Sequence, residues 1–266
     1  MRNNDIQFLN VSFAEERGTQ AHRIAFRQRH ATAEGDAQPG IVWLGGFRSD
    51  MESTKALAID AWAETKGRAF LRFDYSGHGE SAGNFDDGTI SVWLEDALAA
   101  IRQLTQGPQV LVGSSMGGWI ALLAARELGR RGETDRLGGM VLIAPALDFT
   151  EALMWAQFTP AIRAEIETSG RWMRPSDYAP APYPITRALI EDGRKHLMLD
   201  SEIRSFCPVH ILQGMRDPDV PWQHAMLLVE HLAADPVSVT LVKDGDHRLS
   251  REEDLERLIR AVDAIA

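Results

Sequence analysis

Apolar and polar positions along the chain follow two different periods. Six short runs are almost continuously apolar, which is typical of strands buried on both faces of a parallel sheet. They read GIVWLGG, RAFLRFDY, QVLVGS, GMVLIAP, PVHILQG and VSVTLVKD, from residues 40, 68, 109, 139, 208 and 237. Two earlier runs, DIQFLNVSF from residue 5 and HRIAFRQ from residue 22, alternate apolar with polar residues and predict an antiparallel hairpin.

Amphipathic stretches with helical spacing separate most of these runs. They cover residues 53–66, 91–105, 116–131, 222–234 and 252–265. Strands that alternate with helices form a mostly parallel sheet covered by helices on both faces. The pattern therefore predicts one α/β domain over residues 1–266, with about eight strands.

The segment from 148 to 206 departs from this alternation. A simple crossover needs about a dozen residues, whereas this one has about 60 and is rich in Trp, Met, Pro and Arg. We expect it to be a lid inserted after the sixth strand. Its large apolar residues predict an acyl pocket, with packing of the lid on the body as the alternative: Leu153, Met154, Trp155, Phe158, Trp172 and Met173.

Three arginines in the same segment, Arg163, Arg171 and Arg174, are candidates for binding a carboxylate or phosphate of the substrate. A guanidinium group suits bidentate recognition of such anions. The alternative is that these side chains are only solvated.

Composition and charge limit the possible partners. Hydrophobic residues make up 44% and charged residues 25%, as in ordinary globular proteins. The net charge of −10, without a basic run, excludes a nucleic-acid surface. No apolar run reaches the roughly 18 residues of a spanning helix, and the polar N-terminus lacks a signal-peptide core. We expect a cytoplasmic protein without stable membrane insertion; no oligomeric state is indicated.

Neither a metal nor a cofactor is expected. The glycines of SGHGESAG are spaced one residue too widely for a dinucleotide fingerprint. The acidic stretch DGDHRLSREEDL has Arg248 and Leu249 where a calcium loop needs an oxygen ligand and a glycine. The one cysteine, Cys207, precedes Pro208 at an apolar strand, which predicts a small buried residue rather than a nucleophile.

The stretch VLVGSSMGGW contains the candidate catalytic nucleophile. Gly113, Ser115 and Gly117 form a G-x-S-x-G motif between a predicted strand and a predicted helix, which is the pattern of a nucleophile elbow. Only very small residues fit two positions before and after a serine held in this strained turn. The motif predicts Ser115 as the nucleophile and leaves Ser114 without a derivable role.

A nucleophilic serine needs a histidine base and a carboxylate, in the chain order Ser, acid, His. His247, in the loop DGDHRL before the final helix, follows both a candidate acid and the serine. Asp217, in GMRDPDVPW after a predicted strand, is the favoured acid. Asp219, in the same loop, is the alternative. It is less favoured, because an acidic residue near a helix N-terminus needs no catalytic role to explain it.

The oxyanion of such a reaction needs two backbone N–H donors. One follows the nucleophile and belongs to Met116; the other lies in the loop after the third strand, WLGGF, and belongs to Phe47. Gly45 and Gly46 would let this loop approach the substrate. His78, in DYSGHGES, precedes the serine and is interpreted as structural.

With these motifs in order, the chain resembles the α/β-hydrolase superfamily over essentially its whole length. The stretches TKALAI, RFDYSGHGES, VGSSMGGW, GMRDPDVPW and DHRL are similar to the branch that contains the mitochondrial palmitoyl-protein thioesterase, also known as the mycophenolic acid acyl-glucuronide esterase. The resemblance implies an α/β-hydrolase fold and a serine esterase or thioesterase that acts on a small-molecule or acylated-peptide substrate. It also implies that Ser115, Asp217 and His247 react, with Phe47 and Met116 as oxyanion donors.

Three expectations qualify this resemblance. The N-terminus shows no Arg- and Ser-rich transit segment, so we expect an untargeted cytosolic relative rather than a mitochondrial protein. The same triad also serves peptidases and C–C hydrolases, which remain alternatives. A catalytically idle member that binds a small ligand is a third possibility.

Overall fold

An eight-stranded sheet forms the centre of the computed structural model, which describes residues 5–15, 18–175, 181–232 and 234–265. Its strand order is β1-β2-β4-β3-β5-β6-β9-β10. The strands are β1 (Gln7–Glu15), β2 (Gly18–Arg29), β3 (Gly40–Leu44), β4 (Phe70–Phe73), β5 (Gln109–Ser114), β6 (Leu137–Ile143), β9 (Val209–Gly214) and β10 (Val237–Val242). From β4 to β10 all neighbours are parallel, whereas β2 runs antiparallel to both β1 and β4. The predicted mostly parallel sheet and the hairpin are confirmed.

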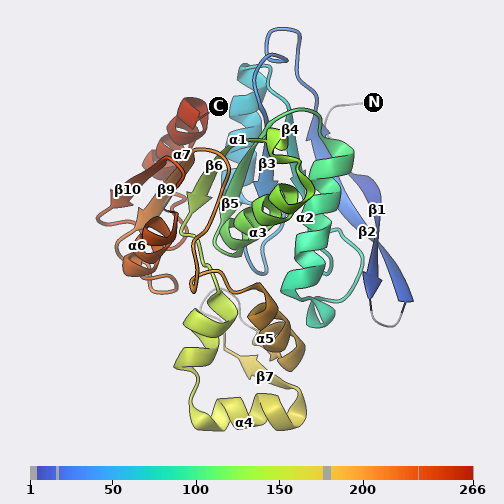
Figure 1. The fold of residues 1–266 in the computed structure, drawn as a ribbon, viewed down its shortest axis with the longest axis vertical. Coiled ribbons are helices and arrows are strands. Elements are labelled where there is room, and N and C mark those ends of the chain that lie inside the picture. The colour runs from blue at the N-terminus through green and yellow to red at the C-terminus, as the bar shows by residue number, and fades with distance from the viewer. Residues whose placement is uncertain (1–4, 16–17, 176–180, 233, 266) are drawn as a thin grey trace.

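Helices cover both faces of this sheet (Figure 1). Ile41 and Trp43 of β3 pack with α1 (Thr54–Thr65) and α7 (Glu252–Ile265) on one face. The alternate residues Val42 and Leu44 belong to the larger cluster on the other face, with α2 (Ile90–Leu104), α3 (Met116–Arg131) and α6 (Trp222–His231). Successive side chains of a strand point to opposite faces, so burial on both faces explains the continuous apolar runs of the inner strands. The prediction is wrong for the last run, because β10 is an edge strand in which only Val242 is buried.

The helix boundaries follow the sequence closely. α3 and α7 have the predicted bounds, α1 is one residue shorter at each end, and α2 begins and ends one residue earlier. Gly132 caps α3 after its last residue, Arg131, with a φ of 74°, a left-handed conformation that glycine adopts readily. α6 ends at His231 rather than Ala234, because Leu232 leaves the helical region with ψ 58°; residue 233 lies outside the described part.

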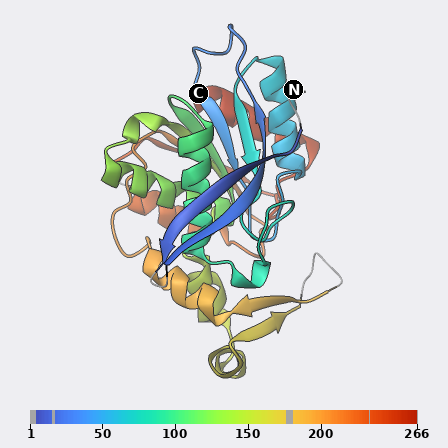
Figure 2. The same cartoon turned by 90° about the vertical axis from the view of Figure 1, so that its right-hand side faces the viewer.

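The segment between β6 and β9 forms a separate small layer at the carboxyl ends of the parallel strands (Figures 1 and 2). In chain order it holds η3 (Thr150–Met154, a π-helical turn), η4 (Trp155–Gln157), α4 (Pro160–Ser169), β7 (Arg171–Arg174), β8 (Tyr183–Thr186), α5 (Arg187–Gly193) and η5 (Arg194–His196). β7 and β8 pair as a two-stranded antiparallel sheet that the sequence pattern did not predict. Residues 176–180, between these strands, lie outside the described residues. Short 3-10 turns elsewhere are η1 (Phe85–Asp87) and η2 (Thr134–Arg136).

Two buried carboxylates tie this segment down. Asp192 of α5 accepts hydrogen bonds from the backbone N–H and the hydroxyl of Ser91 at 2.8 and 2.9 Å. Asp148 accepts the backbone N–H groups of Met198 and Leu199 at 2.9–3.0 Å. The Asp192 hydrogen bonds join the segment to α2. The Asp148 hydrogen bonds join the start of the segment to a stretch near its end.

Candidate active site

The turn between β5 and α3 holds Ser115 in a strained conformation. Its φ is 54° and its ψ is −116°, in a region that side chains with a Cβ rarely adopt. Its N–H donates to the Ile143 carbonyl at 2.8 Å, which anchors the turn to β6. A Cβ on Gly113 would collide with the Gly117 backbone, and one on Gly117 would collide with the Leu44 carbonyl. Both glycines are therefore required by the geometry of the turn.

Three side chains from different loops form one hydrogen-bonded line. His247 Nε2 lies 3.1 Å from Ser115 Oγ, and His247 Nδ1 lies 2.7 Å from Asp217 Oδ2. The side chain of Asp217 is fully buried, and its other oxygen accepts the N–H groups of Asp219 and Val220 at 2.8 Å. A carboxylate held this way keeps the proton of a neutral imidazole on Nδ1 and leaves Nε2 free to accept the serine proton.

Of the two candidate acids, Asp217 is the one that contacts His247. Asp219 lines the neighbouring cavity instead, and its N–H supports Asp217. Among the described residues, Asp217, Asp219 and His247 form the one group whose ligand atoms lie within 4.8 Å of one another, as a metal site would require. The hydrogen bonds to Asp217 and His247 already occupy the lone pairs that a metal would need.

The predicted oxyanion donors flank Ser115. Met116 is the first residue of α3, so its N–H has no intrahelical acceptor. Phe47 lies in the loop after β3, and its N–H donates to no group among the described residues. The preceding Gly46 passes the Ser115 side chain so closely that a Cβ there would lie 3.5 Å from it. Within the described part of the chain, two backbone donors without an acceptor thus accompany the serine.

His78 supports the loop that carries Phe47. The N–H of Arg48 donates to His78 Nε2 at 3.2 Å, and His78 Nδ1 lies 3.2 Å from the Ser76 carbonyl. Since a backbone N–H can only donate, the ring proton belongs on Nδ1. Burial holds the pKa of His78 below its ordinary value, which favours this neutral ring. The predicted structural role of His78 thus takes a definite form: it fixes the residue next to the oxyanion donor.

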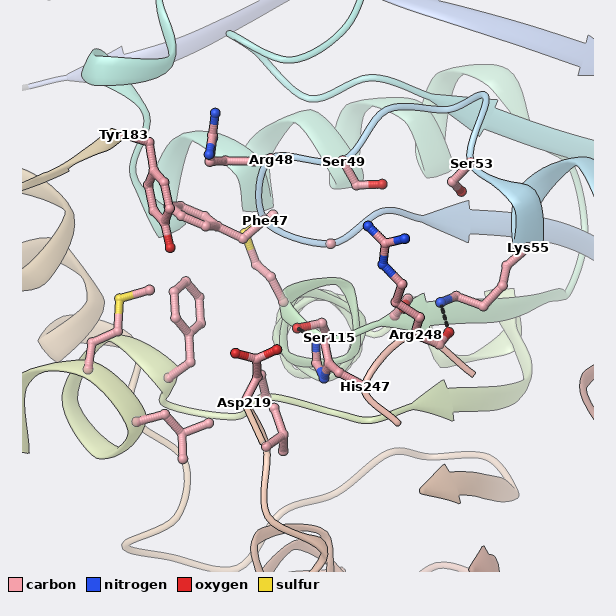
Figure 3. Close-up of a pocket in the computed structure, with 18 of the residues that line it drawn as sticks. Phe47, Arg48, Ser49, Ser53, Lys55, Ser115, Tyr183, Asp219, His247 and Arg248 are labelled. Atoms are coloured by element: carbon pink, nitrogen blue, oxygen red, sulfur yellow. Dashed lines mark hydrogen bonds between the residues drawn. The ribbon is translucent and has the colours of Figure 1, made fainter. Parts of the chain in front are cut away.

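A cavity of about 450 Å³ opens beside Ser115 and has two unlike sides (Figure 3). On one side lie Phe47 and Tyr183, with Arg48 stacked over the Tyr183 ring at 4.3 Å. On the other side lie Ser49, Ser53, Lys55 and Arg248. Further apolar lining comes from Ala146, Phe149, Leu153 and Met154.

Four residues predicted to line an acyl pocket lie elsewhere. Trp155, Phe158, Trp172 and Met173 are not part of the cavity wall. Phe158 instead packs between Trp155 and Trp172, with ring centroids 6.4 and 5.3 Å away, and Met173 is 43% exposed. Their apolar surface stabilises the segment itself, whereas Leu153 and Met154, from the same prediction, do line the cavity.

The three predicted anion-binding arginines also separate. Arg163 donates to the carbonyls of Trp155 and Ala156 at 3.1 Å, and Arg171 pairs with Asp86 at 3.4 Å. Only Arg174 lines the cavity. The sequence pattern missed Arg48, Lys55 and Arg248, which lie far apart in the chain and meet only in the fold.

Cys207 is buried, as predicted. Burial raises the pKa of its thiol to about 12, so the reactive thiolate is scarce at neutral pH. The residue packs in the larger core cluster.

Comparison with known proteins agrees with this geometry. The model of the alpha/beta hydrolase family matches residues 40–261, which is most of the chain. The chain belongs to the α/β-hydrolase family. The bovine (Bos taurus) palmitoyl-protein thioesterase ABHD10, mitochondrial, is 37% identical over 226 residues, covering 85% of this chain and 72% of that protein.

Solved structures give the same result for this α/β hydrolase. A protein from Agrobacterium vitis S4 matches with a TM-score of 0.92 and 48% identity over 99% of both chains. Mouse alpha/beta hydrolase domain-containing protein 10 matches with a TM-score of 0.84 and 32% identity over 98% of both chains. The predicted fold and the resemblance to the palmitoyl-protein thioesterase branch are confirmed.

The expected cytoplasmic location is wrong. The mammalian relatives that are 35–37% identical to this chain over 226 residues are named as mitochondrial proteins. Net charge and hydropathy describe the folded body, whereas receptors read an organelle address from a separate signal. Within the described residues, no helix is both long and apolar enough to cross a membrane.

Proposed function

We propose that this α/β hydrolase cleaves carboxylic esters and thioesters through an acyl-enzyme formed on Ser115. The observation that carries the proposal is the line Asp217–His247–Ser115, with distances of 2.7 and 3.1 Å, at a strained turn beside two unused N–H donors. The thioesterase names of the relatives support the same bond class.

In the first half-reaction, Ser115 Oγ attacks the carbonyl carbon while His247 Nε2 takes the hydroxyl proton. Asp217 stabilises the resulting imidazolium without becoming protonated itself. The N–H groups of Phe47 and Met116 bind the oxygen that becomes negative. His247 then gives its proton to the departing alcohol or thiol, which leaves an ester on Ser115.

In the second half-reaction, water takes the place of the leaving group. His247 accepts a water proton as the hydroxide attacks the acyl carbon, and it returns this proton to Ser115 Oγ as the acid departs. The enzyme is restored, and the net reaction adds one water to one ester or thioester. An acylated small molecule or an acylated peptide is the expected substrate.

We also propose that residues 148–206 act as a lid on a single domain spanning residues 1–266. The segment supplies Phe149, Leu153, Met154 and Tyr183 to the cavity wall beside Ser115. An apolar wall next to the nucleophile suits an acyl chain, because each buried methylene contributes about 0.8 kcal/mol.

Substitution of the nucleophile tests the mechanism. Ser115→Ala should lower kcat/KM for p-nitrophenyl acetate by at least about 10⁴-fold and abolish labelling by a fluorophosphonate probe. Ser114→Ala is the matched control, since it removes the adjacent hydroxyl, and it should retain labelling and most of the activity. Undiminished labelling of Ser115→Ala would overturn the assignment.

The same probe separates the alternative functions. A catalytically idle ligand binder would hydrolyse no ester and bind no probe. A peptidase or C–C hydrolase would be labelled but would turn over amide or β-diketone substrates faster than p-nitrophenyl esters and acyl thioesters. Either result would replace the proposed bond class.

A further inference from the structure

The cavity gathers positive charge in a strongly acidic chain. The protein has 38 Asp and Glu residues against 28 Lys and Arg. Yet four cationic side chains line the cavity: Arg48, Lys55, Arg174 and Arg248. Asp219 is the only acidic residue among the described lining residues, and Figure 3 draws it on the other side of Ser115 from Lys55. In the described part of the wall, cations therefore outnumber carboxylates. Arg48 and Arg174 lie with Tyr183, whereas Lys55 and Arg248 lie across Ser115 from it.

Lys55 is the most unusual of these cations. It is only 9% exposed, and its ammonium donates to the carbonyl oxygen of Arg248. Among the described residues, no carboxylate lies within ion-pair distance of it. An ammonium carries three donors, and burial of a charge without a counter-ion costs several kcal/mol. Lys55 lines the cavity, so an anion bound there would supply the missing counter-ion.

The start of α1 strengthens this preference. Ser53 is the N-cap, but its side chain makes no capping hydrogen bond, and the first turn holds no acidic residue. The positive end of a helix macrodipole disfavours a lysine in the first turn by roughly 0.3–1 kcal/mol. Lys55 lies in that turn, and the carboxylates that act on it, Asp246, Asp254 and Asp217, come from other elements and make no ion pair with it among the described residues.

Two buried donors in the same wall have no partner. The hydroxyl of Ser53 and the indole N–H of Trp43 are both inaccessible and lack a hydrogen-bond partner among the described residues. Trp43 is 1% exposed, and it lines the cavity together with Ser53 and Lys55. Buried polar groups are normally hydrogen-bonded. Unpartnered donors in the wall of a cavity favour a ligand that supplies oxygen acceptors.

The position of this wall selects one half of the substrate. Arg248 follows His247 directly in the chain, and Figure 3 shows Arg248 and Lys55 opposite Tyr183 and Phe47 across Ser115. His247 must protonate the leaving group, so the leaving group lies on its side of the nucleophile. The opposite side, where Phe47, Tyr183 and the apolar residues of the lid line the cavity, is left for the acyl chain.

We propose that an anion-binding subsite recognises a carboxylate or phosphate on the leaving group of the substrate. It is formed by Lys55, Arg248, Trp43 and Ser53. The subsite rests on the proposed function for its orientation. It makes the enzyme selective for esters and thioesters whose alcohol or thiol part carries an anion. Carboxylate and phosphate share the required oxygens, and the experiment distinguishes them.

Three acetyl esters with the same aromatic leaving group provide the test. They are the esters of 4-hydroxybenzoate, of 4-hydroxyphenyl phosphate and of methyl 4-hydroxybenzoate, the last being neutral. The wild-type kcat/KM should be at least about 10-fold higher for one of the anionic esters than for the neutral one, mainly through a lower KM. The preferred anionic ester identifies the anion.

The variants Lys55→Met and Arg248→Met should each reduce this anionic-to-neutral ratio about 10-fold or more. A charge-assisted hydrogen bond of roughly 1.5–3 kcal/mol corresponds to this change. Lys195→Met is the matched control, because it removes the same charge from an exposed side chain of the lid, and its ratio should equal that of the wild type. Equal kcat/KM for the three esters in the wild type would overturn the subsite.

Binding without turnover separates this proposal from the mechanism. Ser115→Ala should bind 4-hydroxybenzoate or phenyl phosphate in calorimetric titration at least 10-fold more tightly than Ser115→Ala/Lys55→Met does. Ser115→Ala/Arg248→Met should show the same loss of affinity, and because Arg248 is exposed, this substitution does not disturb a buried position. Equal binding by all three proteins would contradict the proposed subsite, even if Ser115 proves to be the nucleophile. Failure of Ser115 labelling would affect only the mechanism.

Discussion

The two regions that meet at the cavity position their residues by different means. At the edge of the sheet, loops after β5, β9 and β10 bring Ser115, Asp217 and His247 together, held by backbone hydrogen bonds such as Ser115 N–H to Ile143. The segment 148–206 reaches the cavity through side chains, such as Tyr183 under the Arg48 guanidinium. A backbone anchor leaves little freedom, whereas side-chain packing tolerates substitution. Changes at the sheet edge should therefore abolish activity, and changes in the segment should shift selectivity.

The largest effect is expected at the elbow. Gly117→Ala would force a Cβ against the Leu44 carbonyl, so either the turn or the oxyanion loop must move. We expect a loss of at least about 100-fold in kcat/KM for p-nitrophenyl acetate, since displacement by about 1 Å has this effect. The free energy of unfolding should fall by about 1–3 kcal/mol, as overpacking typically costs. Steady-state kinetics and thermal denaturation measure the two effects.

Gly132→Ala is the control for this substitution at the other end of α3. Its Cβ would meet nothing within 4 Å, but its φ of 74° disfavours alanine. It should lower stability by about 1 kcal/mol while kcat/KM stays near that of the wild type. If Gly117→Ala retained full activity, the elbow would be more adaptable than its backbone contacts imply.

A smaller effect is expected on the lid side of the cavity. Leu153→Trp should fill part of the apolar wall and lower the ratio of kcat/KM for p-nitrophenyl octanoate to that for the acetate. Exclusion of roughly two methylenes, at about 0.8 kcal/mol each, corresponds to about a 10-fold change. Leu227→Trp, at a 45% exposed position of α6, is the control and should not alter the ratio. An unchanged octanoate ratio in Leu153→Trp would move the acyl chain to another part of the cavity.

The smallest effect is a pH dependence of leaving-group selectivity. Burial lowers the pKa of Lys55 to about 8; Asp246, Asp254 and Asp217 oppose this shift, and Arg248 adds to it. Below this pH the ammonium binds an anion, and above it the neutral amine does so weakly. The ratio of kcat/KM for the 4-hydroxybenzoate ester to that for its methyl ester should therefore fall several-fold as pH rises through about 8.

The ratio isolates Lys55, because ionisation of the catalytic groups affects both esters equally and the carboxylate stays charged. Lys55→Arg keeps its charge at all of these pH values, so its ratio should not fall. A wild-type ratio that is constant from pH 6 to 9.5 would contradict a role for the Lys55 charge.

Local pattern was sufficient for the sheet and for the elbow. Periodicity predicted the eight strands of the main sheet and the bounds of helices α3 and α7. Strands and helices can be told apart in this way because burial of a strand and burial of one helix face produce different hydrophobic periods. The G-x-S-x-G motif and the chain order Ser, Asp, His indicated the three residues that the structure brings within hydrogen-bond distance. The hydrophobic periods and the elbow motif can be read from the sequence because each depends on neighbours a few residues away, whereas the chain order of the three residues comes from the resemblance to the family.

Local pattern could not decide which lid residues reach the cavity. Trp172 and Leu153 are both large and apolar, yet one packs inside the segment and the other lines the cavity. The difference depends on the β7–β8 pairing and on the approach of the segment to the body, which bury one apolar face against another.

By itself, then, the sequence determined the sheet, the covering helices and the nucleophile motif, because these follow from hydrophobic period and from short turns with strict steric needs. Tertiary structure alone decided the lining of the cavity. Lys55, Arg248 and Trp43 come from a helix, a loop and a strand far apart in the chain, and no sequence period brings their donors together. Their juxtaposition depends on α1 and the His247 loop packing at the same edge of the sheet, where Lys55 meets the Arg248 carbonyl.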